Sequence, residues 1–354
     1  MNAQWMRQLG AVVSLEWKKS FFNRRSLWIY LLAALPMVIF VGHALETKFT
    51  RERLARQRTP QVTMERARTL REGMTPEQVE AILGQAPSRQ TRGSRRNRIQ
   101  SWNYSDGERQ INVRFRNGEL ERWSSNESCN VSEDLHIFAG VYQFFFLRLM
   151  VFFGCVFVFL NLFRGEMLDK SLHYYFLAPI RREVVVAGKF IAGLIATTVI
   201  FGTSVALQLG ALYWHFDGPK LEQYLSQGGG WQHSLAYVAI TGLACLGYGS
   251  VFLTGGMLLK NPLIPAAVIL VWESINGVLP AMLRKLSVIY YLKSLCPVEI
   301  PIDKGVPPFL AMLVMNVEPV APWIAVLGLV VLSGVMVTLA ARRSRTLEIQ
   351  YGAE

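Results

Sequence analysis

Charged side chains are scarce in this chain of 354 residues, since they make up 18% of the sequence while hydrophobic residues make up 51%. Soluble globular domains carry about 25% charged residues, so the chain has few solvating groups for its length. Several stretches of about 18 or more residues are almost free of charge, and each can cross a bilayer core about 30 Å thick. The sequence therefore predicts a multi-pass membrane protein and argues against a cytosolic enzyme.

Cysteine and histidine are also rare. The four cysteines show no C-x-x-C spacing, and no Cys/His cluster has the spacing of a structural zinc site. Cys129 and Cys296 could form a disulfide if both face an oxidising compartment. The five histidines lie near span ends without metal-ligand spacing, so no metal is expected. They are His43, His136, His173, His215 and His233.

A phosphate-binding loop is missing as well. The motif G-x-x-x-x-G-K-[ST] does not occur, and Ala187-Gly188-Lys189-Phe190 lacks both the first glycine and the hydroxyl residue. We therefore expect no bound cofactor and no enzymatic activity in this chain. Any ATP hydrolysis that it uses would come from a partner.

Basic residues outnumber acidic ones, 37 to 25, which gives a formal net charge of +12. Such a balance can indicate a nucleic-acid partner, but here many basic residues lie at the ends of apolar spans, where they set orientation in a membrane. They concentrate before the first span, in 164–183 and after the last span. This pattern predicts that both termini are cytosolic and that nucleic acid is not a partner.

The predicted fold class is an α-helical membrane protein with six transmembrane helices. Residues 1–26 are predicted to form a cytosolic amphipathic helix at the membrane interface, because they combine apolar residues with basic ones and few acidic ones. Residues 137–341 form the core that contains the last five helices, and 342–354 form a cytosolic tail. The predicted spans are 27–45, 137–163, 184–214, 234–258, 262–282 and 321–341.

Residues 46–136 are predicted to form a small α+β domain outside the membrane, inserted between the first two spans. Thr75, Pro76 and Gln78 have the pattern of a helix N-terminus with a capping box, and Gly84 is expected to end that helix. Three strand signals follow, separated by Asp-Gly at 106–107 and Asn-Gly at 117–118. Alternating apolar residues predict their buried face.

The segment 164–183 is predicted to contain a short amphipathic helix that Pro179 ends, with an acidic residue, Glu166, before it. Its apolar residues recur at helical spacing at Leu168, Leu172, Tyr175 and Phe176. The segment resembles the first cytosolic loop of ABC type-2 permeases, although Lys170-Ser171 stands where the family often has Gly-Thr. An ordinary amphipathic loop is the alternative interpretation.

The resemblance to ABC type-2 permeases covers all of the chain except the inserted domain. It implies an exporter subunit that pairs with a second copy or a homologous permease, and a separate ATPase that binds the 164–183 helix in a groove. It leaves the substrate open. The alternative from another class is a non-transporting scaffold whose outer domain recruits envelope-assembly proteins, while secondary transport is disfavoured because no internal repeat is evident.

The outer domain resembles the BamE/SmpA/OmlA family of small periplasmic lipoprotein domains. The resemblance rests on Gly73-Met74-Thr75, Leu83-Gly84, Pro87, the Trp102/Tyr104 strand and the Phe115…Gly118…Leu120 hairpin. It implies a protein-interaction module and a bacterium with a periplasm, which places the chain in the inner membrane. A spacer domain without a partner is the alternative.

Two ionisable residues lie deep inside predicted spans. Arg148 is counted from the outer start of its span and Glu273 from the inner start of another, and both counts give a depth of about 16 Å. Charges at such depth are costly and mark functional or paired sites. We predict that they line a transport pathway or pair with each other. In the alternative, Arg148 extends toward the interface and Glu273 is protonated.

Overall fold

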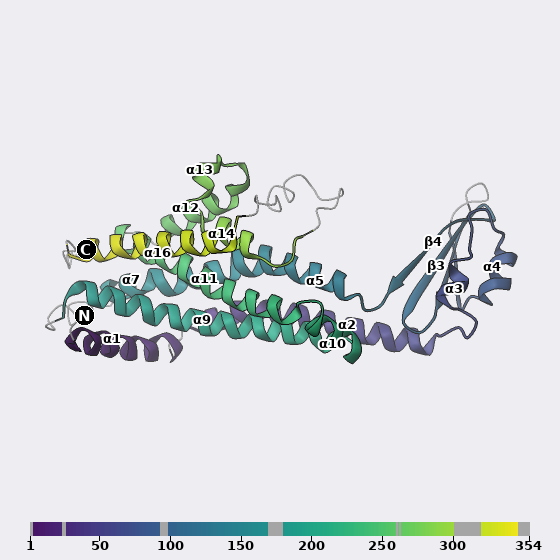
Figure 1. Ribbon diagram of the computed structural model, residues 1–354, viewed down its shortest axis with the longest axis horizontal. Helices are drawn as coiled ribbons and strands as arrows, with labels where there is room; N and C mark the ends of the chain where they lie inside the picture. Colours follow the sequence, from purple (N-terminus) through teal and green to yellow (C-terminus); the bar gives the residue numbers. More distant parts are fainter. Residues whose placement is uncertain are drawn as a thin grey trace. The chain divides into compact units, whose positions relative to one another are not determined.

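The computed structural model describes residues 3–22, 26–92, 98–168, 180–259, 261, 263–300 and 320–345. The chain divides into two compact units. Unit 1 comprises Met1–Ile39, Leu135–Gly210 and Glu222–Glu354, and unit 2 comprises Phe40–Asp134 and Ala211–Leu221. Unit 1 is helical, whereas unit 2 holds a small antiparallel sheet with short helices (Figure 1).

The described part of the chain consists mostly of helices. They are α1 (Ala3–Phe22), α2 (Ser26–Arg56), α3 (Met64–Ala67), α4 (Pro76–Leu83), α5 (Val131–Gly140), η1 (Val141–Val151), α6 (Phe152–Cys155), η2 (Val156–Leu160), α7 (Asn161–Leu168), α9 (Arg182–Trp214), α10 (Gly218–Ser226), α11 (Gly230–Leu258), α12 (Leu263–Ser274), η3 (Asn276–Val278), α13 (Ala281–Arg284), α14 (Val288–Leu295) and α16 (Pro322–Arg345). The stretches η1 and η2 are π-helical, and they join α5, α6 and α7 into one continuous helix.

Five helices in the described residues are long and apolar enough to cross a membrane, which identifies a membrane-embedded protein. They are Leu27–Arg56, Val131–Phe163, Arg182–Trp214, Gly230–Leu258 and Pro322–Arg345. They correspond to the predicted first, second, third, fourth and sixth spans. Their length is a local property of the sequence, so the prediction needed no tertiary information.

The predicted fifth span, 262–282, differs from the structure, because it is not one helix. The apolar helix α12 ends at Ser274, and the short helices η3, α13 and α14 follow. Asn276-Gly277 and Pro280 disfavour a continuous helix at this point. The sequence-based count overlooked these breakers inside an apolar run, so the described residues contain five helices long enough to span a membrane and do not confirm a sixth.

The packing of α14 in unit 1 depends on glycines in its neighbours. A Cβ atom on Gly247 of α11 would lie 2.7 Å from Val288 Cγ1, and one on Gly328 of α16 would lie 2.5 Å from Tyr291 Cε1. These glycines therefore permit a close approach that a larger residue would block. α14 accordingly buries Val288 and Ile289 against the helices around it.

The ends of three helices in unit 1 lie together. Arg182, at the start of α9, donates to the carbonyl oxygens of Ser344 and Arg345 at the end of α16, at 3.3 and 3.2 Å. The Arg181 guanidinium lies 5.7 Å from the ring centroid of Trp5 on α1. The end of the 164–183 segment, at Arg181 and Arg182, thus contacts both α1 and α16.

The sheet of unit 2 is a four-stranded antiparallel meander in the order β1-β2-β3-β4. Its strands are β1 (Ser88–Arg92), β2 (Ile99–Ser105), β3 (Arg109–Arg116) and β4 (Glu119–Glu127). The last three match the predicted strands, and the structure adds β1. This edge strand pairs only with β2 in the described sheet and is polar, so it gave no alternating apolar signal.

The capping box of α4 is confirmed. Thr75 Oγ1 accepts from the Gln78 backbone N–H at 3.4 Å, and Gln78 Oε1 accepts from the Thr75 N–H at 3.0 Å. The helix buries Val79 and Leu83 against the sheet's apolar face, where Val113 and neighbouring side chains complete one core. All four cysteines lie in the described residues and are free thiols, so the disulfide considered from the sequence is not formed.

Replacing Thr75 by alanine is expected to lower the stability of the full-length protein by about 1 kcal/mol, because the Gln78 backbone N–H loses the Thr75 hydroxyl as its acceptor. Thr91→Ala, at an exposed position of β1, is the matched control and should change stability little. Thermal unfolding in detergent, followed by the fluorescence of the Trp102 environment, measures both. Equal effects of the two replacements would contradict the role of the cap.

Candidate functional site

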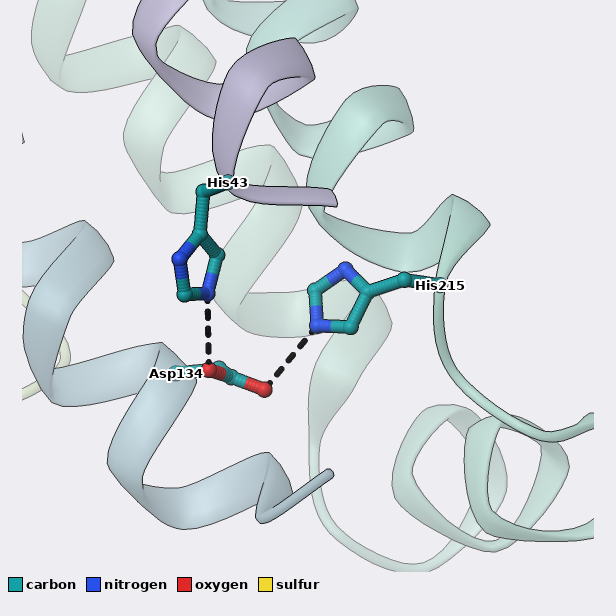
Figure 2. A group of neighbouring side chains, drawn as sticks. All are labelled: His43, Asp134 and His215. Carbon is teal, nitrogen blue, oxygen red and sulfur yellow. Dashed lines mark hydrogen bonds and ion pairs between the residues drawn. The ribbon is translucent and has the colours of Figure 1, made fainter. Parts of the chain in front are cut away.

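Three side chains in unit 2 that are distant in sequence converge on one point (Figure 2). His43 Nε2 lies 3.1 Å from Asp134 Oδ1, and His215 Nε2 lies 3.0 Å from Asp134 Oδ2. The two imidazole rings stand at 89° with centroids 5.5 Å apart. Each ring therefore contacts a different oxygen of one carboxylate, and we call this group the His–Asp–His cluster.

Three separate elements supply the cluster. His43 comes from α2, Asp134 from the first turn of α5, and His215 from the residue directly after α9. Asp134 and His215 are buried, while the His43 side chain is 30% exposed. The cluster is thus sheltered but reachable by solvent from the side of His43.

The backbone at His215 is held by contacts from α2 and from the start of α5. Arg51, about two helical turns after His43, donates from Nη1 to the His215 carbonyl oxygen at 3.0 Å and forms an ion pair with Asp217. The Cys129 thiol also points at that carbonyl, at 3.9 Å. The chain that carries His215 is therefore fixed from two directions.

Charges around the cluster are paired with one another. The hydrogen bond from Arg51 lowers the pKa of Asp217, and the hydrogen bond to Glu127 at 2.7 Å raises the pKa of Lys220. Burial raises the pKa of the Cys129 thiol, which favours its neutral form. Consequently Arg51 and Lys220 are directed at their own partners, and the carboxylate of Asp134 is left to the two imidazoles.

One polar atom of the cluster lacks a partner. His215 Nδ1 is buried and has no hydrogen bond in the described residues. Its Nε2 contacts Asp134, so only one of the two nitrogens of the His215 ring has a hydrogen-bond partner in the described residues. Buried polar atoms of this kind are uncommon and call for an explanation.

The His–Asp–His cluster was not predicted from the sequence, because its members have no motif spacing. Nevertheless, His43 and His215 both lie near the predicted outer ends of their spans, and Asp134 lies just before the outer start of another. Spans that pack together bring such ends to one membrane face. Chemistry-bearing residues at like ends of predicted spans are therefore the signal that could have found it.

The structure brings the two predicted intramembrane residues together through the backbone. Arg148 Nη2 lies 3.5 Å from the carbonyl oxygen of Glu273, and the buried Arg148 Nε and Nη1 have no hydrogen-bond partner among the described residues. Among the described ion pairs none joins the guanidinium to the Glu273 carboxylate. Arg148 also lies within the π-helical stretch η1, a geometry that often accompanies functional positions.

The Glu273 carboxylate has other partners. It accepts from the Ser287 hydroxyl at 2.7 Å and from the backbone N–H groups of Val288 and Ile289 at 3.0 and 2.9 Å. A carboxylate at a helix N-terminus satisfies amides that have no partner within the helix. Glu273 therefore ties the end of α12 to the start of α14.

The predicted ATPase-coupling residues fall largely outside the described residues. The structure does not describe Leu172, Tyr175, Phe176 and Pro179. It places Glu166 and Leu168 in α7 but does not describe their side chains. The flanks of the segment are described, however. The segment 164–183 begins within α7 and ends in the first turn of α9.

A buried ion pair connects those flanks to α1. Lys189 Nζ lies 2.7 Å from Glu16 Oε1, and the two side chains are 0% and 4% exposed. The same ammonium donates to the Leu162 carbonyl oxygen at 3.3 Å and lies 5.5 Å from the ring centroid of Phe163. Helices α1, α7 and α9 thus meet at one charged group.

Comparison of the chain with protein-family models, with curated proteins and with solved structures finds no match.

Proposed function

We propose that the chain is the membrane-spanning permease subunit of an ATP-driven exporter in a bacterial inner membrane, and that a separate subunit hydrolyses the ATP. Two copies, or this chain and a homologous permease, would enclose the pathway. The outer α+β domain would contact a periplasmic protein. The proposal is supported by the apolar spans, by the sequence of the 164–183 segment and by the missing phosphate-binding loop.

The observation that carries the proposal is the Glu16–Lys189 ion pair. It lies at the flanks of the segment expected to dock an ATPase, and it joins α1 and α7 to the first turns of α9. A force applied to 164–183 would be transmitted to α9, because the Lys189 ammonium of α9 is desolvated and contacts both α1 and α7. ATP-driven motion of the partner would then tilt the spans and change access to the pathway.

The decisive variant carries Leu172→Asp and Phe176→Asp. Two charges on the predicted apolar face would have to be desolvated in the ATPase groove, which should reduce the recovery of the ATPase by more than about tenfold. The matched control, Lys170→Asp with Tyr174→Asp, places two charges on the opposite face of the same predicted helix. The measurement is ATP hydrolysis in the affinity-purified complex, normalised to the permease.

Equal hydrolysis by both double variants would place the contact elsewhere. If the wild-type complex purified from native membranes shows no ATP hydrolysis at all, the exporter proposal fails. That outcome would favour the scaffold interpretation, in which the outer domain recruits envelope proteins and no transport occurs.

A further inference from the structure

The His–Asp–His cluster has the composition of a metal site. One nitrogen from each imidazole and one carboxylate oxygen all lie within 4.8 Å of one another. Imidazole nitrogen with carboxylate oxygen is a donor set for Zn²⁺ and neighbouring divalent transition metals. Two of the three residues are buried, so this cluster is unlike the exposed acidic groups that occur on any surface.

The geometry needs only a small adjustment to hold an ion. With bonds of about 2.0–2.1 Å, the ligand atoms of a tetrahedral zinc site are about 3.4 Å apart. The two nitrogen–oxygen separations of 3.1 and 3.0 Å are already near that value. His43 is the most exposed member, and rotation of its side chain would close the remaining gap.

The electrostatic surroundings leave the carboxylate available. Arg51 is directed to the His215 carbonyl and to Asp217, and Lys220 is directed to Glu127. In the described residues no ammonium or guanidinium pairs with Asp134. A divalent cation would therefore meet a carboxylate that pairs with no ammonium or guanidinium in the described residues and lies between two imidazole rings.

We propose that His43, Asp134 and His215 bind one divalent transition-metal ion of the Zn²⁺ class. The ion takes the place of the two hydrogen bonds to Asp134 and ties α2, the start of α5 and the chain after α9 together within unit 2. Three protein ligands leave at least one coordination position for water or an incoming ligand. The inference is independent of the exporter proposal.

Metal content of the full-length protein tests the site directly. The protein is purified in detergent with an affinity tag that contains no histidine, stripped with a chelator, incubated with Zn²⁺ and desalted. Inductively coupled plasma mass spectrometry should then find about one equivalent of zinc per chain. Added Zn²⁺ should also raise the midpoint of thermal unfolding, because it binds the folded state.

Matched variants assign the ligands. His43→Ala and Asp134→Asn should each weaken zinc binding by more than about tenfold, and Asp134→Asn preserves the size of the side chain. His136→Ala, which removes a histidine from α5 outside the cluster, should keep full occupancy. Co²⁺ in place of zinc should give the visible absorption of a low-coordinate site in the wild type and in His136→Ala alone.

The wild-type measurement does not depend on the folding of any variant. Failure of the stripped wild type to retain zinc would overturn the proposal and leave a purely hydrogen-bonded cluster. Equal zinc retention by the wild type, His43→Ala and Asp134→Asn would overturn it as well. Binding without a rise in the unfolding midpoint would disprove that the ion ties the three segments together.

Discussion

Replacing Glu273 by alanine is expected to destabilise the folded protein by about 3 kcal/mol or more. The carboxylate is 2% exposed and accepts three hydrogen bonds, from the Ser287 hydroxyl and from the N–H groups of Val288 and Ile289. Each buried donor left without a partner costs about 1–3 kcal/mol. The loss would free the start of α14, which packs between α11 and α16.

The measurement is the thermal midpoint of the detergent-solubilised protein, with the yield of monodisperse protein as a second readout. Glu273→Gln keeps one acceptor oxygen and should lie between the wild type and Glu273→Ala. Ser274→Ala is the matched control, because that hydroxyl donates only within α12, to the Leu270 carbonyl. A Glu273→Ala variant as stable as Ser274→Ala would disprove the cap.

The same variant bears on the predicted pair of Arg148 and Glu273. The Arg148 guanidinium contacts the Glu273 carbonyl oxygen, which remains in Glu273→Ala. In a double-mutant cycle with Arg148→Met, the losses should therefore add to within about 0.5 kcal/mol. A coupling well above that value would indicate a direct interaction of the two charges, as the sequence-based hypothesis has it.

Replacing Glu16 by alanine is expected to cost about 3–5 kcal/mol, because the Lys189 ammonium would stay buried without its carboxylate. The side chains of this pair are 4% and 0% exposed, so water cannot replace the lost partner. The double variant Glu16→Leu with Lys189→Met removes both charges and should be far milder. Thermal unfolding measures the loss in Glu16→Ala, and thermal unfolding of Glu16→Leu, Lys189→Met and the double variant completes the cycle.

An exposed ion pair in unit 1 provides the comparison. Arg345 pairs with Glu183, and the Arg345 side chain is 68% exposed. Arg345→Ala should therefore cost less than about 1 kcal/mol. If Glu16→Ala costs no more than Arg345→Ala, the joint between α1 and α9 contributes little, and the exporter proposal loses its main structural support.

Features that depend only on residues close together along the chain were predictable from the sequence. The apolar runs that form α2, α9, α11 and α16 can be recognised in the sequence, because a helix that crosses a membrane needs only sufficient length and hydropathy. The capping box at Thr75 and Gln78 was predictable because both hydrogen bonds close within four residues.

Two elements show where the local pattern misleads. The edge strand β1 is polar because it has a partner on one side only, so no apolar alternation announced it. The run 262–282 is apolar throughout much of its length, yet α12 ends at Ser274. The Glu273 carboxylate accepts from the N–H groups of Val288 and Ile289 at the start of α14, and this tertiary contact is invisible in a hydropathy pattern.

The sequence by itself determined that the chain is membrane-embedded, which five stretches form the long apolar helices of the described residues, and that a small α+β domain follows the first of them. The tertiary structure alone decided which polar residues meet. Asp134 lies 91 residues from His43 and 81 from His215, and Lys189 lies 173 from Glu16. Such contacts arise because helices that pack side by side bring residues of similar depth together, whatever their separation along the chain.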